Sequence, residues 1–148
     1  MKTNKAVLTQ KINSMSRIYS VFISHSWSHV DDLRKLRNLL ENRGYFQVEF
    51  EEASPDEPIN SENSAYIRRR LREKISNSDI VLGIAGVYAS HSDWMEWELD
   101  TALKEKVPIV GVIPRGQKRI SKIVTDRSVE NVHWNVESIV EAIRKWAK

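Results

Sequence analysis

The fold of this chain is decided by two apolar runs, Asp79-Ile-Val-Leu-Gly-Ile-Ala85 and Val107-Pro-Ile-Val-Gly-Val-Ile113. Neither run alternates apolar with polar residues, as a strand with one solvated face does. Continuous short runs rich in valine and isoleucine are typical of strands that are buried on both faces in the middle of a parallel sheet. The two runs therefore predict the central third and fourth strands of an α/β sheet.

Outward from these runs, weaker patterns predict three more strands, at residues 19–24, 45–50 and 131–134. Between the strands, apolar residues recur at helical spacing. Gly44 is expected to end the first helix. The predicted helices cover residues 33–40, 65–75, 94–105 and 136–147. Strands that alternate with helices form parallel sheets with right-handed crossovers. We expect a flavodoxin-like, five-stranded parallel sheet in the order 2-1-3-4-5, with helices on both faces.

Length and composition restrict the class of protein. The chain has 148 residues, 41% of them hydrophobic and 29% charged, with a net charge of +3. These values suit one soluble domain, which we place at residues 18–148 after an N-terminal arm of residues 1–17. No apolar run reaches the roughly 18 residues of a membrane-spanning helix, and residues 1–17 lack the apolar core of a secretory signal. The absence of cysteine excludes disulfides, thiol nucleophiles and cysteine-zinc sites. We expect a cytoplasmic protein.

The common nucleotide motifs are missing from the sequence. No GxGxxG follows the first strand, and no GxxxxGK[ST] is present anywhere. A phosphate-accepting receiver domain shares the topology, but it needs acidic residues after the first strand and an Asp at the end of the third. The chain has Ser24-His25 and Ala85-Gly86 at these positions, which excludes the receiver interpretation.

Ligands of such sheets bind at the carboxyl ends of the strands, where the strand order reverses. In this chain Ser24-His-Ser26 and the helix that starts near Trp94 should meet there. At about 100° per residue, Glu98 shares a face with Trp94, whereas Glu96 points toward solvent. We therefore expect Glu98 to be the partly desolvated carboxylate, with a raised pKa or a cation-stabilising role. A structural role for Glu98, in a cap or an ion pair with a neighbouring helix, stays open as the alternative.

Two further kinds of site are less well supported by the sequence. His25 and His29 have the i, i+4 spacing of a helical metal site, but no Cys and no carboxylate pair accompanies them, so we expect no metal. Basic residues cluster at 68–74 and 115–127. No aromatic residues are interleaved with them, as binding of single-stranded nucleic acid requires, so nucleic acid is an unlikely partner.

Three segments resemble Toll/interleukin-1 receptor (TIR) domains. Val21-Phe-Ile-Ser-His-Ser26 is similar to their first box, and Ser78-Asp-Ile-Val-Leu-Gly-Ile84 is similar to the entry into their third strand. The most specific segment is Ser92-Asp-Trp-Met-Glu-Trp-Glu98, which resembles the S-x-W-x-x-x-E motif of NAD-consuming TIR domains. The doubled tryptophan and the strand at 107–113 look most like the bacterial and archaeal TIR-like group, which includes the signal-producing subunit of Thoeris anti-phage systems.

This resemblance implies an enzyme that cleaves the nicotinamide–ribose bond of NAD⁺, with NAD⁺ as substrate and no cofactor or metal. The product would be ADP-ribose or a cyclic ADP-ribose-type signal, and the context would be anti-phage defence. Carried over by position, Glu98 becomes the catalytic residue. The implied nucleotide-pocket residues are Phe22, Ser24, His25, Ser26, Trp94 and Trp97.

The resemblance also implies partners, namely further copies of the chain or another TIR-containing or effector protein of a defence system. The loop at 51–63 departs from the family pattern: it is acidic and lacks the R-D-x-x-P-G core, and we expect it to be the most mobile internal segment. Some TIR domains are only adaptors, so a non-catalytic assembly module is the competing hypothesis.

Overall fold

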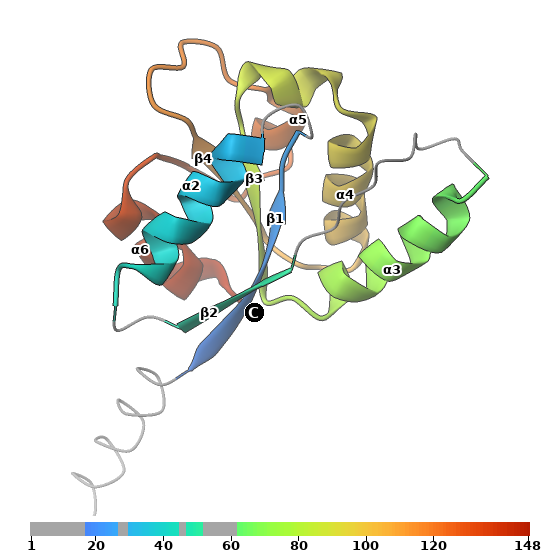
Figure 1. Ribbon diagram of the computed structural model, residues 1–148, viewed down its shortest axis with the longest axis horizontal. Coiled ribbons are helices and arrows are strands. Elements are labelled where there is room, and N and C mark those ends of the chain that lie inside the picture. Colours follow the sequence, from blue (N-terminus) through green and yellow to red (C-terminus); the bar gives the residue numbers. More distant parts are fainter. Residues whose placement is uncertain (1–16, 27–29, 45–46, 52–61) are drawn as a thin grey trace, which may run out of the picture.

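The computed structural model describes residues 17–26, 30–44, 47–51 and 62–148, and its core is one parallel sheet (Figure 1). The strands lie in the order β2-β1-β3-β4-β5, and every neighbouring pair is parallel. Their bounds are β1 (Ile18–Ser24), β2 (Gln47–Glu51), β3 (Ile80–Ile84), β4 (Ile109–Ile113) and β5 (Glu130–His133). The α/β class with a parallel sheet, expected from the two apolar runs, is confirmed.

The helices fall between the strands, as the apolar spacing predicts. They are α2 (Val30–Glu41), α3 (Ser64–Ser76), α4 (Asp93–Lys104), α5 (Lys122–Thr125) and α6 (Val136–Trp146), with a 3-10 helix, η2 (Val87–His91), before α4. The sequence did not predict η2, because it is too short to show a helical period. Gly44 has a φ of +74° and lies three residues after the end of α2. The arm at 1–16 and most of the acidic loop, residues 52–61, lie outside the described residues, so the mobility expected there stays a prediction.

Helices cover both faces of the sheet, and each face has its own apolar core. Alternate residues of β1 divide between the two. Val21 and Ile23 pack on the side of α2 and α6, whereas Phe22 packs with residues of α3, α4 and α5 on the other side. All five residues of β3 and all five of β4 are buried. Because Ser24 follows Phe22 by two positions in the strand, it faces the same side as α4.

A glycine lets the helices on the α4 side approach the sheet closely. Gly83 of β3 is the register partner of Ser24. A Cβ at this position would lie 3.1 Å from a methyl carbon of Val124 and 3.5 Å from one of Leu99. Glycine inside a strand often marks such a close approach. Gly83 therefore allows α4 and α5 to pack directly beside the carboxyl end of β1.

Candidate functional site

A buried hydrogen bond joins the end of β1 to α4. The Ser24 hydroxyl donates to Oε1 of Glu98 over 2.8 Å. Both side chains are inaccessible to solvent, with relative exposures of 0% for Ser24 and 4% for Glu98. The contact lies at the carboxyl edge of the sheet, at the end of β1, next to the point between β1 and β3 where the strand order reverses. This is the switch point at which ligands of open parallel sheets bind.

The protonation of Glu98 is dominated by its burial. Desolvation disfavours the charged carboxylate and raises the pKa of Glu98 from 4.5 to about 8, while the hydrogen bond from Ser24 acts in the opposite direction. No ion pair joins Glu98 to any residue in the described part of the chain. Among these residues, the structural alternative therefore has no ion-pair partner for Glu98. The site holds a carboxyl group that is mostly neutral at pH 7.

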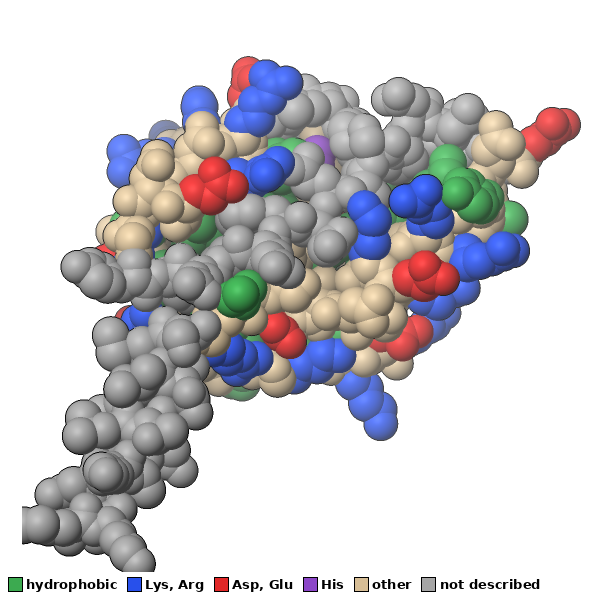
Figure 2. Space-filling view, turned by 60° about the horizontal axis from the view of Figure 1, so that its bottom comes forward, with side chains coloured by type: hydrophobic (Ala, Val, Ile, Leu, Met, Phe, Trp, Pro, Cys, Tyr) green, Lys and Arg blue, Asp and Glu red, His purple; other side chains and the backbone are tan. Residues whose placement is uncertain are grey.

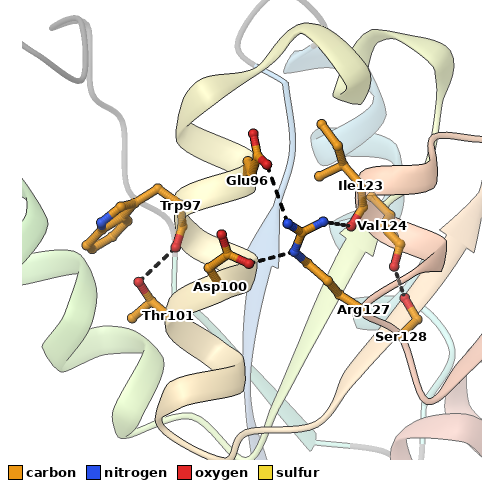
Figure 3. A network of polar contacts seen from close by, with 8 residues as sticks. All are labelled: Glu96, Trp97, Asp100, Thr101, Ile123, Val124, Arg127 and Ser128. Carbon is orange, nitrogen blue, oxygen red and sulfur yellow. Dashed lines mark hydrogen bonds and ion pairs between the residues drawn. The ribbon is translucent and has the colours of Figure 1, made fainter.

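The helical phase separates the two glutamates of α4 as expected. Glu96 points to the outer side of the helix, where it and Asp100 meet the guanidinium of Arg127 (Figure 3). The distances from Arg127 are 3.4 Å to Glu96 Oε1 and 2.6 Å to Asp100 Oδ1. Arg127 also donates to the carbonyl oxygen of Ile123 over 3.0 Å. This network ties the end of α5 to α4 and leaves Glu98 on the inner side.

The start of α4 sets the position of Glu98 along the helix. Glu98 is the sixth residue of α4 and lies in its second turn. The first turn is fixed by Ser92, whose hydroxyl accepts a hydrogen bond from the Met95 backbone N–H over 3.2 Å. An N-cap of this kind sets where the helix begins. The start of α4 at Asp93 thus places Trp94 at the helix end and Glu98 one turn deeper.

The other candidate residues lie around this hydrogen bond in different environments. His25 is buried, and its Nδ1 lies 3.2 Å from the carbonyl oxygen of the half-buried Ser26. Trp94 is buried and meets the half-buried Trp97 edge to face, with ring centroids 5.9 Å apart. Phe22 is fully buried in the same core cluster as Trp94, so here it contributes packing. A direct nucleotide contact by any of these side chains stays a prediction.

Trp97 is also turned toward α3. The guanidinium carbon of Arg72 lies 5.8 Å from the centroid of its ring, within the range of a cation–π contact. Arg72 belongs to the basic face of α3, which also carries Arg68, Arg69 and Arg70. In Figure 2, Lys and Arg side chains are spread over the end of the molecule with α3, and acidic side chains lie among them. A mixed surface of this kind is typical of a solvated helix face.

Sequence reasoning missed two features of the site. It grouped Ser24 with the pocket residues but did not predict that its hydroxyl binds Glu98. It also missed Arg127, although the i, i+4 spacing of Glu96 and Asp100 shows that one cation can reach both. Gly83 offered a further signal, since a glycine inside an apolar strand indicates close packing by a neighbouring element.

Neither a cluster of metal ligands nor a membrane-spanning helix is present among the described residues. Among residues 17–26, 30–44, 47–51 and 62–148, no three His, Cys, Asp or Glu side chains are grouped as metal ligands. His29, one half of the i, i+4 pair, lies outside these ranges. No helix in the described part of the chain is both long enough and apolar enough to cross a membrane.

Two solved structures share the fold at low sequence identity. The 2-deoxyribosyltransferase of Bacillus psychrosaccharolyticus aligns with a TM-score of 0.59 and 19% identity, covering 81% of this chain and 89% of that one. The CMP N-glycosidase BcmB of Clostridium botulinum aligns with a TM-score of 0.51 and 13% identity, covering 84% and 97%. At these identities the likeness concerns the fold alone.

The sequence comparisons are more specific. A probable 3′ cyclic ADP-D-ribose synthase, ThsB′, of Bacillus cereus (strain MSX-D12) is 30% identical over 102 residues, which cover 66% of this chain. The matched region spans about half of that relative, 51% of its length. Residues 22–119 match the TIR-like domain of the Thoeris protein ThsB, and this segment contains Ser24, Trp94 and Glu98. The chain therefore belongs to the family of ThsB TIR-like domains.

Proposed function

We propose that this chain cleaves the nicotinamide–ribose bond of NAD⁺, with Glu98 as the catalytic residue. The observation that carries the proposal is the buried Ser24–Glu98 hydrogen bond at the carboxyl edge of the sheet, in a site without a cation among the described residues. The family supports it, since the similar ThsB′ protein is named as a probable cyclic ADP-ribose synthase. Burial of a carboxyl group without a counter-charge costs stability, so a role in binding positive charge explains its presence.

The reaction needs a group that stabilises positive charge on the ribose. When the bond between ribose C1′ and the pyridinium nitrogen breaks, its electron pair goes to nicotinamide, which leaves neutral. The ribose then carries the positive charge of an oxocarbenium-like state, as in glycoside cleavage. A carboxylate beside the ring stabilises this charge most strongly where water is excluded. Nicotinamide is a good leaving group without protonation, so one carboxylate is sufficient.

The raised pKa of Glu98 gives this mechanism a proton step. Without ligand, Glu98 is mostly protonated at pH 7 because it is desolvated. A pyridinium or ribosyl cation placed next to it favours the ionised form and lowers its pKa. We propose that Glu98 releases its proton to solvent water as the cationic part of NAD⁺ enters. Binding of the substrate thus produces the Glu98 carboxylate that stabilises the transition state.

Ser24 acts in this proposal as a positioning residue. Its hydroxyl holds Oε1 of Glu98, and Oε2 has no hydrogen-bond partner among the described residues. Oε2 is therefore the oxygen that we assign to the ribose. Trp94 and Trp97 would supply aromatic faces for the pyridinium or the adenine ring, because indole attracts cations and stacks on bases. His25 and Ser26 would hydrogen-bond the sugar or the phosphates, with Phe22 packed behind them.

The fate of the ribosyl cation decides the product. Attack by water gives ADP-ribose and one proton, whereas attack by a hydroxyl or adenine nitrogen of the same molecule gives a cyclic ADP-ribose isomer and one proton. We propose the cyclic product, because the similar ThsB′ protein is named for it. The Thoeris family supports a further part of this proposal. The cyclic product would act in the cytoplasm as a signal in anti-phage defence, together with another protein of the system.

Incubation of the purified chain with NAD⁺, with the products separated by chromatography, tests the proposal. We expect nicotinamide and one adenine-containing product in equal amounts, and mass spectrometry separates the cyclic isomer from ADP-ribose. Glu98→Gln should reduce turnover roughly 100-fold or more, as expected for loss of a preorganised electrostatic group. Glu96→Gln is the matched control on the same helix and should retain activity. Equal turnover by the two variants would show that Glu98 is not the catalytic residue.

A further inference from the structure

A polar cavity lies between α2 and the segments that follow β4 and β5. It has a volume of about 180 Å³ and is lined by Asp32, Lys35, Pro114, Arg115, Gln117 and Trp134. Asp32 and Lys35 belong to α2, whereas the other residues follow β4 and β5 at their carboxyl ends. Trp134 packs against the core under α2 and α6, and Glu98 lies on the α4 side. The cavity is therefore separate from the proposed NAD⁺ site.

The charges at this cavity favour an anion. The Lys35 and Arg115 side chains are exposed, and neither forms an ion pair or hydrogen bond with a described residue. Asp32 is the only acidic side chain among the lining residues, so the two cations exceed the acidic charge by one. Unpaired cations at the mouth of a cavity attract anionic ligands and lose this attraction as salt screens them. The ligand should therefore carry a negative group at the rim.

The inner wall favours a flat ring. Trp134 is half-buried and Pro114 is buried, which gives the cavity an aromatic and an aliphatic surface. An indole face stacks well on a heterocyclic base. The cavity is smaller than the roughly 300 Å³ at which drug-sized pockets begin, so it holds a ring and not a whole dinucleotide.

Two polar side chains that line the cavity, Gln117 and Asp32, provide a hydrogen-bond donor and an acceptor. The Oε1 atom of Gln117 accepts a hydrogen bond from the Val87 backbone N–H over 3.3 Å, so the amide nitrogen of Gln117 remains as a donor. The Asp32 carboxylate is an acceptor on the other element. A donor and an acceptor of this kind suit the edge of a nucleobase, which presents both.

We propose that this cavity binds a mononucleotide, with its base against Trp134 and its phosphate between Lys35 and Arg115. The base takes the enclosed volume, and the phosphate stays at the exposed rim where the two free cations lie. Neither cation nor Trp134 takes part in the proposed NAD⁺ site. Binding of a mononucleotide can therefore be tested independently of NAD⁺ cleavage.

The test is a titration of the ¹⁵N-labelled chain with AMP, followed by the indole N–H signal of Trp134 and the side-chain amide of Gln117. We expect saturable shifts of both signals. Adenosine and inorganic phosphate, each of which lacks one half of the ligand, should bind more weakly. Trp134→Leu should weaken AMP binding roughly tenfold through the lost stacking, and Arg115→Ala up to about fivefold through the lost ion pair.

Arg119→Ala is the matched control, because Arg119 is an exposed cation of the same segment that does not line the cavity. It should leave AMP binding unchanged. Arg115 is exposed, so its substitution tests the site without a risk to folding. The proposal is overturned if AMP gives no saturable shift, or if Arg115→Ala and Trp134→Leu bind AMP like the parent, which would place AMP elsewhere. Phosphate that binds as tightly as AMP would also overturn it, because the ring would then contribute nothing.

Discussion

Replacement of Glu98 by Gln should change how the stability of the protein depends on pH. The folded state holds the Glu98 proton up to a pKa of about 8, whereas the unfolded chain releases it near 4.5. Between these values the folded state binds more protons, so the free energy of unfolding of the parent falls as the pH rises. Gln carries no titratable proton, so this part of the pH dependence disappears in the variant.

The size of the effect follows from the two pKa values. Each pH unit between 4.5 and 8 costs the parent about 1.4 kcal/mol relative to the variant. From pH 4.5 to pH 7 the difference in unfolding free energy should therefore move by about 3 kcal/mol in favour of Glu98→Gln. Above pH 8 it should stay constant. The Gln amide group adds a cost of about 1–3 kcal/mol if it finds no acceptor, but this cost does not change with pH.

Urea unfolding at pH 4.5, 5.5, 7 and 8.5, followed by circular dichroism at constant ionic strength, measures this difference. The corresponding change in melting temperature between pH 4.5 and 7 is about 10 °C for a chain of this size. Glu96→Gln is the control: its carboxylate is half exposed and paired with Arg127, so it should change stability by less than about 1 kcal/mol at every pH. A difference between Glu98→Gln and the parent that is flat from pH 4.5 to 8 would refute the argument, since it would mean that Glu98 is ionised and solvated in the folded protein.

Two further predictions concern activity. Because the proposed mechanism needs the ionised form of Glu98, kcat/KM for NAD⁺ should rise with pH, reach half of its maximum near pH 8, the pKa of the free enzyme, and level off above it; a profile that falls over pH 6–8 would contradict this. Ser24→Ala removes the hydrogen bond that lowers the pKa of Glu98, so the midpoint of this profile should move to higher pH while stability falls by about 1 kcal/mol. Unfolding and rate measurements on Ser24→Ala test both parts, with Ser138→Ala as control, because the Ser138 hydroxyl forms no hydrogen bond with a described residue.

The sequence was sufficient for the features that depend on local periodicity. The continuous apolar runs at 79–85 and 107–113 predicted buried strands, and β3 and β4 lie within them. The 100° step of the helix was enough to separate Glu98 from Glu96, because both sit on one regular element whose N-cap is Ser92. Predicted strand and helix ends differ from the observed ones by zero to three residues, with the largest difference at the start of α2.

What could not be predicted depends on contacts between distant segments. The Ser24–Glu98 hydrogen bond joins residues 74 positions apart and requires the particular height of α4 on the sheet, which Gly83 makes possible. Arg127 meets Glu96 and Asp100 only because α5 packs beside α4, and α5 is too short to show a period. The cavity at Trp134 combines residues after two strands with residues of α2, so no single stretch of sequence contains it.

The burial of Glu98 links the stability of the fold to its proposed chemistry. An apolar or amide side chain at this position would remove the pH-dependent cost described above. The chain nevertheless has a carboxyl group there, and Ser24 is its one hydrogen-bond partner among the described residues. The same desolvation that makes the empty site unfavourable makes a carboxylate attract a cation more strongly than it would in water. If Glu98→Gln stabilises the folded protein at neutral pH and also abolishes NAD⁺ cleavage, the cost in stability and the gain in activity come from the same residue. Such a trade-off between stability and activity is expected at a binding site whose unliganded form is energetically unfavourable and whose ligand relieves that cost.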